Sequence, residues 1–466
     1  MNLQRAFRRF GTAFPLLLVA VVFVPFLARP QAQSASSLDG LWLTDGYGRL
    51  IEFKGDELRR YEITAVSCIP TADAKRRAAA ELRDEIIFAA DGDTIRITPG
   101  TSADTRWMHE DGSVSSVFLR RTPSRPDVCN KPVADTPANN YEVFWKTFAE
   151  NYPFFKLRKM DWAAADRKFR PQITPATKPE ELFHILSGMI EPLHDAHTFI
   201  GAKSIKQRFH GYRTPDPMQK TNAKRITEII ETKYVHGGLS DFCNKQLQYG
   251  KLSDSIGYLR IHSFSGYSKD DEFMKQLDAL EAALDVMFKD SAKLTGLVID
   301  VRINTGGSDV FGVSIASRLA TQDYLAYSKV IRNDIHDEDH RTPGQPVSVR
   351  VSTRPSFHGA IVLLTSADSV SAAETFTMAI LDRQPHVTRV GANSQGVFSD
   401  VLGRKLPNGG SFGLPNEIYL TKDGKAFDGP GVPPDIETPI FTAEDLAAGR
   451  DSALDKALEL LAQKPK

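Results

Sequence analysis

The sequence has no excess of positive or negative charge, and this balance limits the kinds of ligand that the protein could bind. Among its 466 residues, Lys and Arg together number 58, as do Asp and Glu, so the formal net charge is zero. Such a protein has no overall field that would draw it to nucleic acid or to an anionic membrane surface. The charge balance therefore argues against polyanion binding, and we expect no nucleic-acid partner.

A hydrophobic run long enough to span a bilayer is missing as well. The apolar run 14–27 is interrupted by Pro15 and Pro25 and falls short of the roughly 20 residues that a membrane helix needs. Arginines precede it and the small-residue stretch 28–35 follows it, the pattern of a secretory signal peptide. We therefore expect a cleaved signal over residues 1–33, no stable membrane span, and an exported protein, periplasmic or secreted.

Cysteine is scarce, with residues at positions 68, 129 and 243 only. No Cys-x-x-Cys pair or Cys/His spacing indicates a structural zinc site, and we expect neither a metal nor a cofactor. Export places the chain in an oxidising compartment, where a disulfide is stable. The spacing does not decide the pairing; we take Cys68 with Cys129 as a hypothesis and leave Cys243 free.

The N-terminal part of the chain consists of short alternating segments. Residues 39–125 alternate apolar and polar positions between Gly, Asp and Asn turn signals, which predicts a small antiparallel β domain. The helix formers at 74–83 allow one helix within it. The proline-rich segment 122–137 is typical of a linker.

The rest of the chain divides into four further parts. Apolar residues at helical spacing predict a helical domain over residues 138–200, whereas 201–254 has no clear period and stays unassigned. Over residues 255–440, apolar strand candidates alternate with helical segments, which indicates an α/β core. The end of the chain, 441–466, has the pattern of a closing amphipathic helix. The length agrees with about three domains.

The most suggestive local pattern is the stretch 360–381, an apolar strand, a short turn and a helix that starts near Ser371. Such a turn exposes one side chain at a sheet edge, and the free amides at the helix start can stabilise negative charge. Ser371 and Glu374 also form the S-x-x-E pattern of a capping box. The motif alone leaves a nucleophile and a simple helix cap both open.

A serine hydroxyl needs a base, and His197 is one candidate. It lies at the end of the predicted helical domain, far from Ser371 in the sequence. His194, Asp195 and His197 could also form an incomplete metal site.

Two further stretches could contribute to a site. Gly306 and Gly307 follow a buried-looking strand, and paired glycines let a backbone N–H approach a ligand closely, although a plain tight turn explains them equally well. Asp428 lies in the Gly/Pro-rich loop 422–439, where carboxylates are usually solvated or turn-forming.

Together, these stretches in this order resemble the tail-specific (carboxy-terminal-processing) protease family, which includes tricorn protease and the repeats of interphotoreceptor retinoid-binding protein. The resemblance covers roughly residues 140–440 and is strongest across GYLRIHSF, DVRINTGG, SAAE and FDGPGVPPD. It implies an α/β fold with a crotonase-like ββα core and a helical domain before it that covers the site. The small N-terminal β domain would be an addition.

The resemblance also implies roles for individual residues. Ser371 opens the S-A-x-E motif and would be the nucleophile, while the amides of Ala372 and of Gly306 or Gly307 would hold the oxyanion. Members with a Ser-Lys dyad carry their lysine where Val397 stands here. Valine cannot accept a proton, so the chain resembles the lysine-free branch of the family.

That branch takes its base from an Asp-x-His-Thr motif, matched here at 195–198, which implies His197 as the base. That branch also has a glutamate that orients the histidine, and the matching position in this chain is Asp428. The aspartate side chain is shorter than that of glutamate by one C–C bond of ~1.5 Å. Tricorn also has a serine directly before its histidine, where this chain has Ala196. No peptide-binding PDZ module is visible.

These observations favour an exported serine peptidase that acts on peptide or protein substrates through an acyl-enzyme. One alternative is a catalytically silent domain of the same fold that binds a hydrophobic ligand, suggested by Asp428 and Ala196. Another keeps the core but stabilises a thioester enolate. Export argues against the coenzyme A substrates that the last alternative requires.

Overall fold

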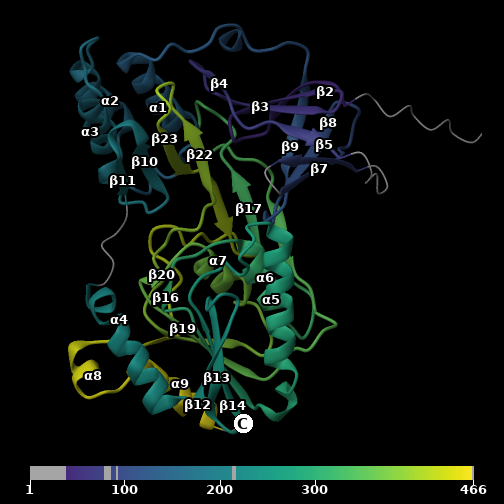
Figure 1. The fold of residues 1–466 in the computed structure, drawn as a ribbon, viewed down its shortest axis with the longest axis vertical. Coiled ribbons are helices and arrows are strands. Elements are labelled where there is room, and N and C mark those ends of the chain that lie inside the picture. Colours follow the sequence, from purple (N-terminus) through teal and green to yellow (C-terminus); the bar gives the residue numbers. More distant parts are fainter. Residues whose placement is uncertain (1–37, 78–84, 91–92, 212–216, 464–466) are drawn as a thin grey trace, which may run out of the picture. The chain divides into compact units, whose positions relative to one another are not determined.

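The computed structural model describes residues 38–77, 85–90, 93–211 and 217–463 (Figure 1). The predicted signal peptide, residues 1–33, lies outside these ranges. Within them, no helix combines the length and the hydropathy needed to cross a membrane.

The N-terminal part of the described chain is a nine-stranded sheet in the order β2-β1-β9-β8-β7-β6-β5-β3-β4, and a further pairing of β2 with β3 closes it on itself. Its apolar side chains alternate along the strands, so that Trp42, Phe53, Phe88 and Met108 share one buried core. The strands are β1 (Gly40–Thr44), β2 (Arg49–Lys54), β3 (Glu57–Ile63), β4 (Cys68–Pro70), β5 (Ala74–Arg76), β6 (Ile86–Ala90), β7 (Asp93–Pro99), β8 (Thr105–Glu110) and β9 (Val117–Thr122).

The helix that the sequence allows at 74–83 is wrong where the structure describes this segment. Residues Ala74–Arg76 form strand β5, which pairs with both β3 and β6. Tertiary pairing has overridden local helix propensity there, and residues 78–84 lie outside the described ranges.

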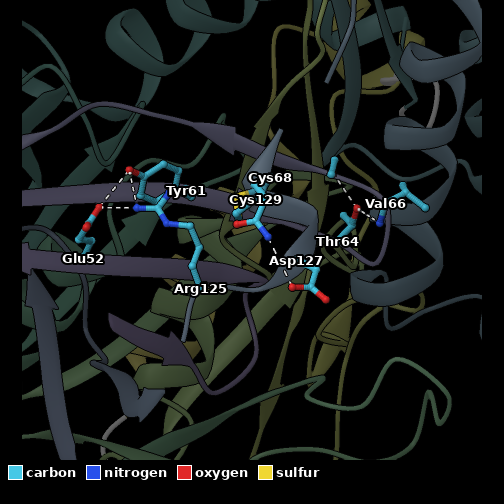
Figure 2. Close-up of a disulfide and its surroundings, with 10 residues drawn as sticks. Glu52, Tyr61, Thr64, Val66, Cys68, Arg125, Asp127 and Cys129 are labelled. Carbon is cyan, nitrogen blue, oxygen red and sulfur yellow. Dashed lines mark hydrogen bonds and ion pairs between the residues drawn. A yellow bond between two sulfur atoms is a disulfide. The ribbon is translucent and has the colours of Figure 1, made fainter. Parts of the chain in front are cut away.

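A disulfide joins Cys68 to Cys129, as predicted, and Cys243 is free (Figure 2). Cys129 lies in the short helix η1 (Asp127–Asn130), so the bridge ties the segment that leaves the sheet back to strand β4. Arg125 adds an ion pair to Glu52 at 2.7 Å. The segment after β9 is thereby fixed on the sheet that it leaves.

The next three helices pack on a four-stranded sheet whose strands come from distant parts of the chain. The helices are α1 (Pro137–Asn151), α2 (Trp162–Phe169) and α3 (Pro179–Ile190). The sheet order is β11-β10-β23-β22, with β10 at Thr198–Ala202, β11 at Gln207–Gly211, β22 at Val401–Lys405 and β23 at Ser411–Pro415. Phe144 and Phe148 of α1 pack against Phe412 of β23 in a shared core. Residues near 200 and near 410 are therefore neighbours.

The largest core surrounds a seven-stranded sheet in the order β12-β13-β14-β15-β19-β21-β25, in which the run from β14 to β25 is parallel. Both faces are covered: Leu297 and Ile299 pack toward α5, α6 and α7, whereas Val298 between them packs toward α4 and α9. Continuous apolar strands are what a parallel sheet buried on both faces requires. The predicted α/β class is confirmed.

The elements of this core are β12 (His236–Phe242), β13 (Leu247–Ser253), β14 (Ile256–Ile261), β15 (Gly296–Asp300), β19 (Ala360–Thr365), β21 (Val387–Gly391), β25 (Ile436–Glu437), α4 (Pro217–Ile229), α5 (Phe273–Phe288), α6 (Asp309–Ser317), α7 (Ala372–Ala379), α8 (Ala443–Ala447) and α9 (Ser452–Ala462). A three-stranded sheet, β18-β17-β24, adjoins it, with β17 at Tyr324–Ile331, β18 at Gln345–Val349 and β24 at Glu417–Leu420.

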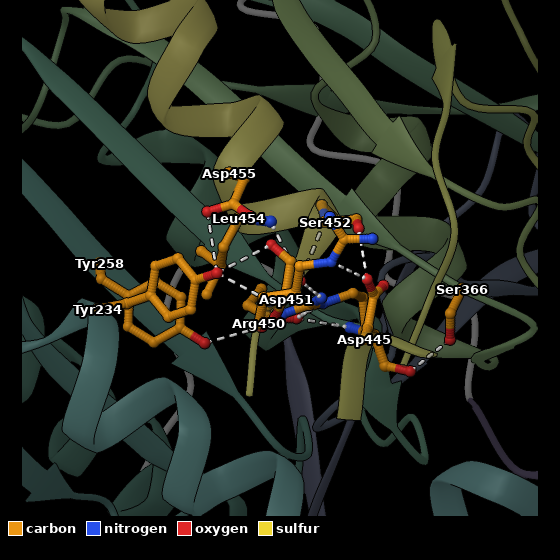
Figure 3. Close-up of polar contacts among 12 residues, drawn as sticks. Tyr234, Tyr258, Ser366, Asp445, Arg450, Asp451, Ser452, Leu454 and Asp455 are labelled. Atoms are coloured by element: carbon orange, nitrogen blue, oxygen red, sulfur yellow. Dashed lines mark hydrogen bonds and ion pairs between the residues drawn. The ribbon is translucent and has the colours of Figure 1, made fainter. Parts of the chain in front are cut away.

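A buried polar network fixes the chain where strand β15 ends. Arg302 is fully buried and pairs with Asp300 at 2.6 Å and with Asp451 at 2.8 Å. Asp451 is also the N-cap of α9, and Figure 3 shows it among the polar contacts of this region, which include Tyr258 and Ser366. Buried charges persist only when paired in this way, so the loop that follows β15 leaves the sheet from a rigid point.

Candidate active site

The candidate site lies at the carboxyl ends of the parallel strands, the edge at which open α/β sheets bind ligands. The loops that follow β15 and β19 are held side by side there by a short parallel pair, β16 (Ile303–Asn304) with β20 (Asp368–Ser369). The N–H of Val370 adds a hydrogen bond to the carbonyl of Asn304 at 3.1 Å. This pairing brings the Gly306–Gly307 turn next to Ser371.

Ser371 has a backbone conformation that serine rarely adopts. Its φ is 57° and its ψ is −118°, whereas an ordinary N-cap residue has extended dihedrals. It does form a capping box with Glu374, whose carboxylate accepts the Ser371 N–H at 3.2 Å. Strain of this kind, of order 1–3 kcal/mol, clusters at functional sites. Capping accounts for the motif but not for the strained backbone.

The paired glycines are required by close contacts. A Cβ on Gly306, whose φ is 87°, would lie 2.6 Å from the Cβ of Ser371 and 3.1 Å from its Oγ. A Cβ on Gly307, whose φ is 142°, would lie 2.1 Å from the carbonyl oxygen of Phe264. The backbone of the turn therefore packs directly against the Ser371 side chain.

The two glycine amides differ in what they can still bind. Gly306 donates its N–H to Asn304 Oδ1 at 2.8 Å, and Asn304 is held in turn by the carbonyl of Ile261. Across the ranges that the structure describes, neither the Gly307 N–H nor the Ala372 N–H donates a hydrogen bond. Gly307 and Ala372 are thus the amides left for an oxyanion.

Glu374 does more than cap a helix. Its buried carboxylate accepts hydrogen bonds from Ser371 N–H, Ser394 Oγ (2.6 Å), Gly396 N–H (2.5 Å) and Val397 N–H (2.8 Å). Burial raises its pKa to about 7, although these donors favour the charged form. Glu374 therefore ties the Ser371 turn to the loop after β21, a role that S-x-x-E spacing alone does not reveal.

His197 lies just before strand β10, and the side chain of Asp195 binds its backbone. The Asp195 carboxylate accepts the His197 N–H at 3.0 Å and the Tyr152 hydroxyl at 2.8 Å, and it lies 3.7 Å from Arg158. Burial lowers the pKa of His197 below its usual value, against the opposing effect of Asp195 and Asp400. The ring is consequently neutral near pH 7, and its buried Nδ1 has no hydrogen-bond partner among the described residues.

Asp428 is buried, with 5% of its surface exposed, so it is not a solvated loop carboxylate. Burial raises its pKa well above the usual range, and the nearby carboxylates of Glu374 and Asp195 add to this. Its Oδ2, like Nδ1 of His197, is buried and has no partner within the described part of the chain. The backbone of Phe398 hydrogen-bonds Asp428, and that of the next residue, Ser399, hydrogen-bonds the His197 ring.

The predicted residues thus fall into two groups. Ser371, Ala372 and the glycine turn are in direct contact, while His197 and Asp428 approach the same segment, 398–399. In the described ranges, no hydrogen bond joins His197 to Ser371 or to Asp428. The same ranges contain no group of three His, Cys, Asp or Glu side chains arranged to hold a metal, so the alternative of a metal site at 194–197 gains no support.

Neither the position of the family's lysine nor the buried Lys329 supplies a proton acceptor here. Val397 is buried at the position where the resemblance would put that lysine, and its N–H binds Glu374. The buried Lys329 lies 2.8 Å from Asp400 and 3.0 Å from Glu417, which hold its pKa well above the usual value. A permanently charged ammonium cannot accept a proton from serine.

Comparison with known proteins agrees with this geometry. Residues 255–438 match Peptidase family S41, and residues 134–191 match the Tricorn protease C1 domain. These matches support a tail-specific protease family for the chain. It resembles tricorn within that family of serine-type peptidases, while residues 38–122 lie outside both matched ranges.

Several known proteins are similar to this chain. The chain is 27% identical over 195 residues to the carboxy-terminal-processing protease of Bartonella bacilliformis, a match that covers 41% of this chain and 40% of that protein. The matched stretch therefore spans less than half the length of this curated relative. Among solved structures, a putative peptidase from Parabacteroides merdae ATCC 43184 shares 26% identity with a TM-score of 0.60, covering 71% of this chain and 98% of that one. Mature CPAF shares the fold at 11% identity, with a TM-score of 0.53 and coverage of 71% and 97%.

Proposed function

We propose that the protein cleaves peptides or proteins through an acyl-enzyme formed on Ser371, with His197 as the general base. The observation that carries this proposal is the strained Ser371, packed against a glycine turn beside two amides that donate no hydrogen bond within the described residues. A catalytically silent ligand-binding domain would have no need for such a turn. The hydrophobic-ligand alternative is therefore not favoured.

In the proposed reaction, His197 takes the proton from Ser371 Oγ as that oxygen attacks the substrate carbonyl. The Gly307 and Ala372 N–H groups stabilise the resulting oxyanion. The imidazolium then gives its proton to the leaving amine, and a water molecule hydrolyses the acyl-enzyme. The lowered pKa of His197 keeps the ring in its basic form at neutral pH.

Asp428 orients His197 in this mechanism. Asp428 Oδ2 and His197 Nδ1 are both buried without a hydrogen-bond partner among the described residues, and the two side chains bind consecutive backbone residues. A hydrogen bond from a protonated Nδ1 to Oδ2 would satisfy both atoms. Catalytic hydrogen bonds are often long before the substrate binds and tighten in the complex. We infer that Asp428 Oδ2 accepts a hydrogen bond from His197 Nδ1 when substrate is bound, stabilising the imidazolium.

We also propose that residues 255–440 form a crotonase-like core, preceded by a helical domain at 138–200 and a β domain at 39–125. Parallel strands with helices on both faces support the first part, and the separate core of the nine-stranded sheet supports the last. Export to the periplasm or the medium is supported by the Cys68–Cys129 disulfide, because such bridges persist in oxidising compartments.

The proposal is tested by comparing the wild type with Ser371→Ala on fluorogenic peptides and on casein. We expect Ser371→Ala to lower kcat by several orders of magnitude. Ser124→Ala, a substitution at an exposed serine after β9, serves as the matched control and should retain full activity. Unchanged hydrolysis by Ser371→Ala would refute the proposed nucleophile.

A further inference from the structure

A cavity of about 380 Å³ lies between the N-terminal sheet and the core edge that carries the candidate site. One wall comes from β8 and the turn 111–115, and the other includes Gly307, Asp309 and Asp400. Gly307 lines the cavity and follows Gly306, on which a Cβ would lie 2.6 Å from the Cβ of Ser371, so the cavity adjoins the glycine turn of the candidate site. Its volume falls within the ~300–1,000 Å³ typical of ligand pockets.

The N-terminal wall is fixed to the core by specific contacts. Ser308, next to Gly307, donates its hydroxyl to the carbonyl of Gly112 at 3.0 Å. Gln345 makes two hydrogen bonds with the backbone of Ser116, at 2.9 and 2.7 Å. A Cβ on Gly112 would lie 3.2 Å from the Phe273 ring, so the turn also packs closely. These contacts fix the turn 111–115 to the core, although this part of the chain lies outside the ranges that match the family models.

The cavity contains an accessible carboxylate. Asp400 lines it, and 52% of its side chain is exposed. One of its oxygens binds Lys329, but that ammonium is shared with the buried Glu417, so one cation offsets two carboxylates. Asp400 therefore keeps negative charge available to a ligand.

The remaining charges around the cavity largely compensate one another. Glu110 lies 3.7 Å from Arg49 and 3.4 Å from Arg60, and Asp111 pairs with Arg96 at 2.8 Å. Asp309 is buried and accepts hydrogen bonds from the hydroxyls of Thr375 and Tyr419.

Asn416 offers a polar group of a different kind to the cavity. Asn416, with 1% of its surface exposed, lines the cavity, and its Nδ2 has no hydrogen-bond partner among the described residues. A ligand with a cation and a carbonyl oxygen, as a basic peptide residue has, would match Asp400 and Asn416 together.

We propose that this cavity is the subsite for a lysine or arginine side chain of the substrate, with Asp400 as counter-ion and the turn 111–115 as the wall that excludes water. The inference rests on the proposed peptidase function and names its substrate class. It gives the N-terminal sheet a part in specificity.

The test measures kcat/KM on fluorogenic peptides that carry either lysine or norleucine at each of four positions around the cleaved bond. Norleucine keeps the aliphatic length and removes the charge. We expect the wild type to prefer lysine at one position by at least about 10-fold, and Asp400→Asn to reduce that ratio to near one. A general effect of Asp400 on His197 would change both peptides equally, so the ratio isolates side-chain recognition.

A second variant examines the N-terminal wall. Ser115→Arg places a positive charge at the cavity, whereas Val66→Arg places it on an exposed turn of the same sheet, away from the cavity. We expect only Ser115→Arg to lower the lysine-to-norleucine ratio. Cleavage by the wild type with no lysine preference at any position, or an Asp400→Asn ratio equal to that of the wild type, would overturn this inference alone. Absence of any Ser371-dependent cleavage would instead refute the proposed function.

Discussion

The two halves of the candidate site differ in how completely their polar groups are satisfied. Around Ser371, the turn is closed by Glu374 with four accepted hydrogen bonds and by Asn304 on the neighbouring loop. Around His197 and Asp428, one buried polar atom on each side chain has no partner in the described chain. The nucleophile half is preorganised, and the base half is incomplete.

This difference follows from where each half is built. The nucleophile half lies on adjacent loops of one rigid parallel sheet, whereas His197 precedes a strand of the four-stranded sheet and Asp428 lies on a late loop. Groups on separate elements can be brought together by a substrate that contacts both. We infer that substrate binding completes the base half.

Among the variants that test this comparison, we expect the largest loss of activity when the proposed base, His197, is removed. We expect His197→Ala to lower kcat by about 10³-fold or more, because a serine hydroxyl is inert without proton removal. His210→Ala, which removes an exposed histidine from the adjacent strand β11, is the matched control and should change kcat by less than about twofold. Equal losses in the two variants would show that His197 has no special role.

Removing Glu374 should instead damage the preorganised half. Glu374→Ala leaves four donors without their acceptor, which we expect to cost about 3 kcal/mol or more of the free energy of unfolding, measured by urea titration. Asp428→Ala removes a carboxylate of which one oxygen has no hydrogen-bond partner among the described residues, and it should cost clearly less free energy of unfolding. If Asp428→Ala were the more destabilising of the two, the contrast between the halves would be wrong.

Asp428 should matter for rate more than for stability. We expect Asp428→Asn to lower kcat by about 10- to 100-fold, because the neutral amide cannot stabilise the imidazolium. Asp428→Glu keeps the charge and should retain more activity than Asp428→Asn. The reverse order in steady-state kinetics would exclude a charged partner for His197 at this position.

The smallest expected effect concerns Asp195, whose carboxylate accepts the backbone N–H of His197. We expect Asp195→Asn to lower kcat by less than about 10-fold, since the amide oxygen can still accept the His197 N–H. A shift in the pH profile of kcat/KM would accompany it, because Asp195 raises the pKa of His197. An unaltered profile would argue that Asp195 has only a packing role.

The nucleophile half could be predicted from the sequence because its parts are local. A strand, a turn and a helix start at 360–381 place Ser371 at a sheet edge, and paired glycines after a strand mark a close approach. Which glycine amide stays free could not be predicted, because it depends on the side chain of Asn304.

The base half depends on contacts that are distant in sequence. Strand β10 pairs with β23 through Phe199 and Gly413, which brings His197 toward residues near 400. No periodicity in the sequence encodes that pairing. The burial of Asp428 and the cavity wall formed by the turn 111–115 likewise depend on packing between separate sheets.

The most direct test of the central claim is the pH dependence of Ser371 acylation by a fluorophosphonate, with the modified residue located by mass spectrometry. If His197 is the base, the acylation rate should fall as the pH is lowered through a pKa below 6.5, because burial lowers the pKa of that ring. In His197→Ala, the high acylation rate at neutral pH should be lost. A midpoint near pH 8 or above, modification of another residue, or the same rate in His197→Ala would contradict the claim that Ser371 is activated by His197.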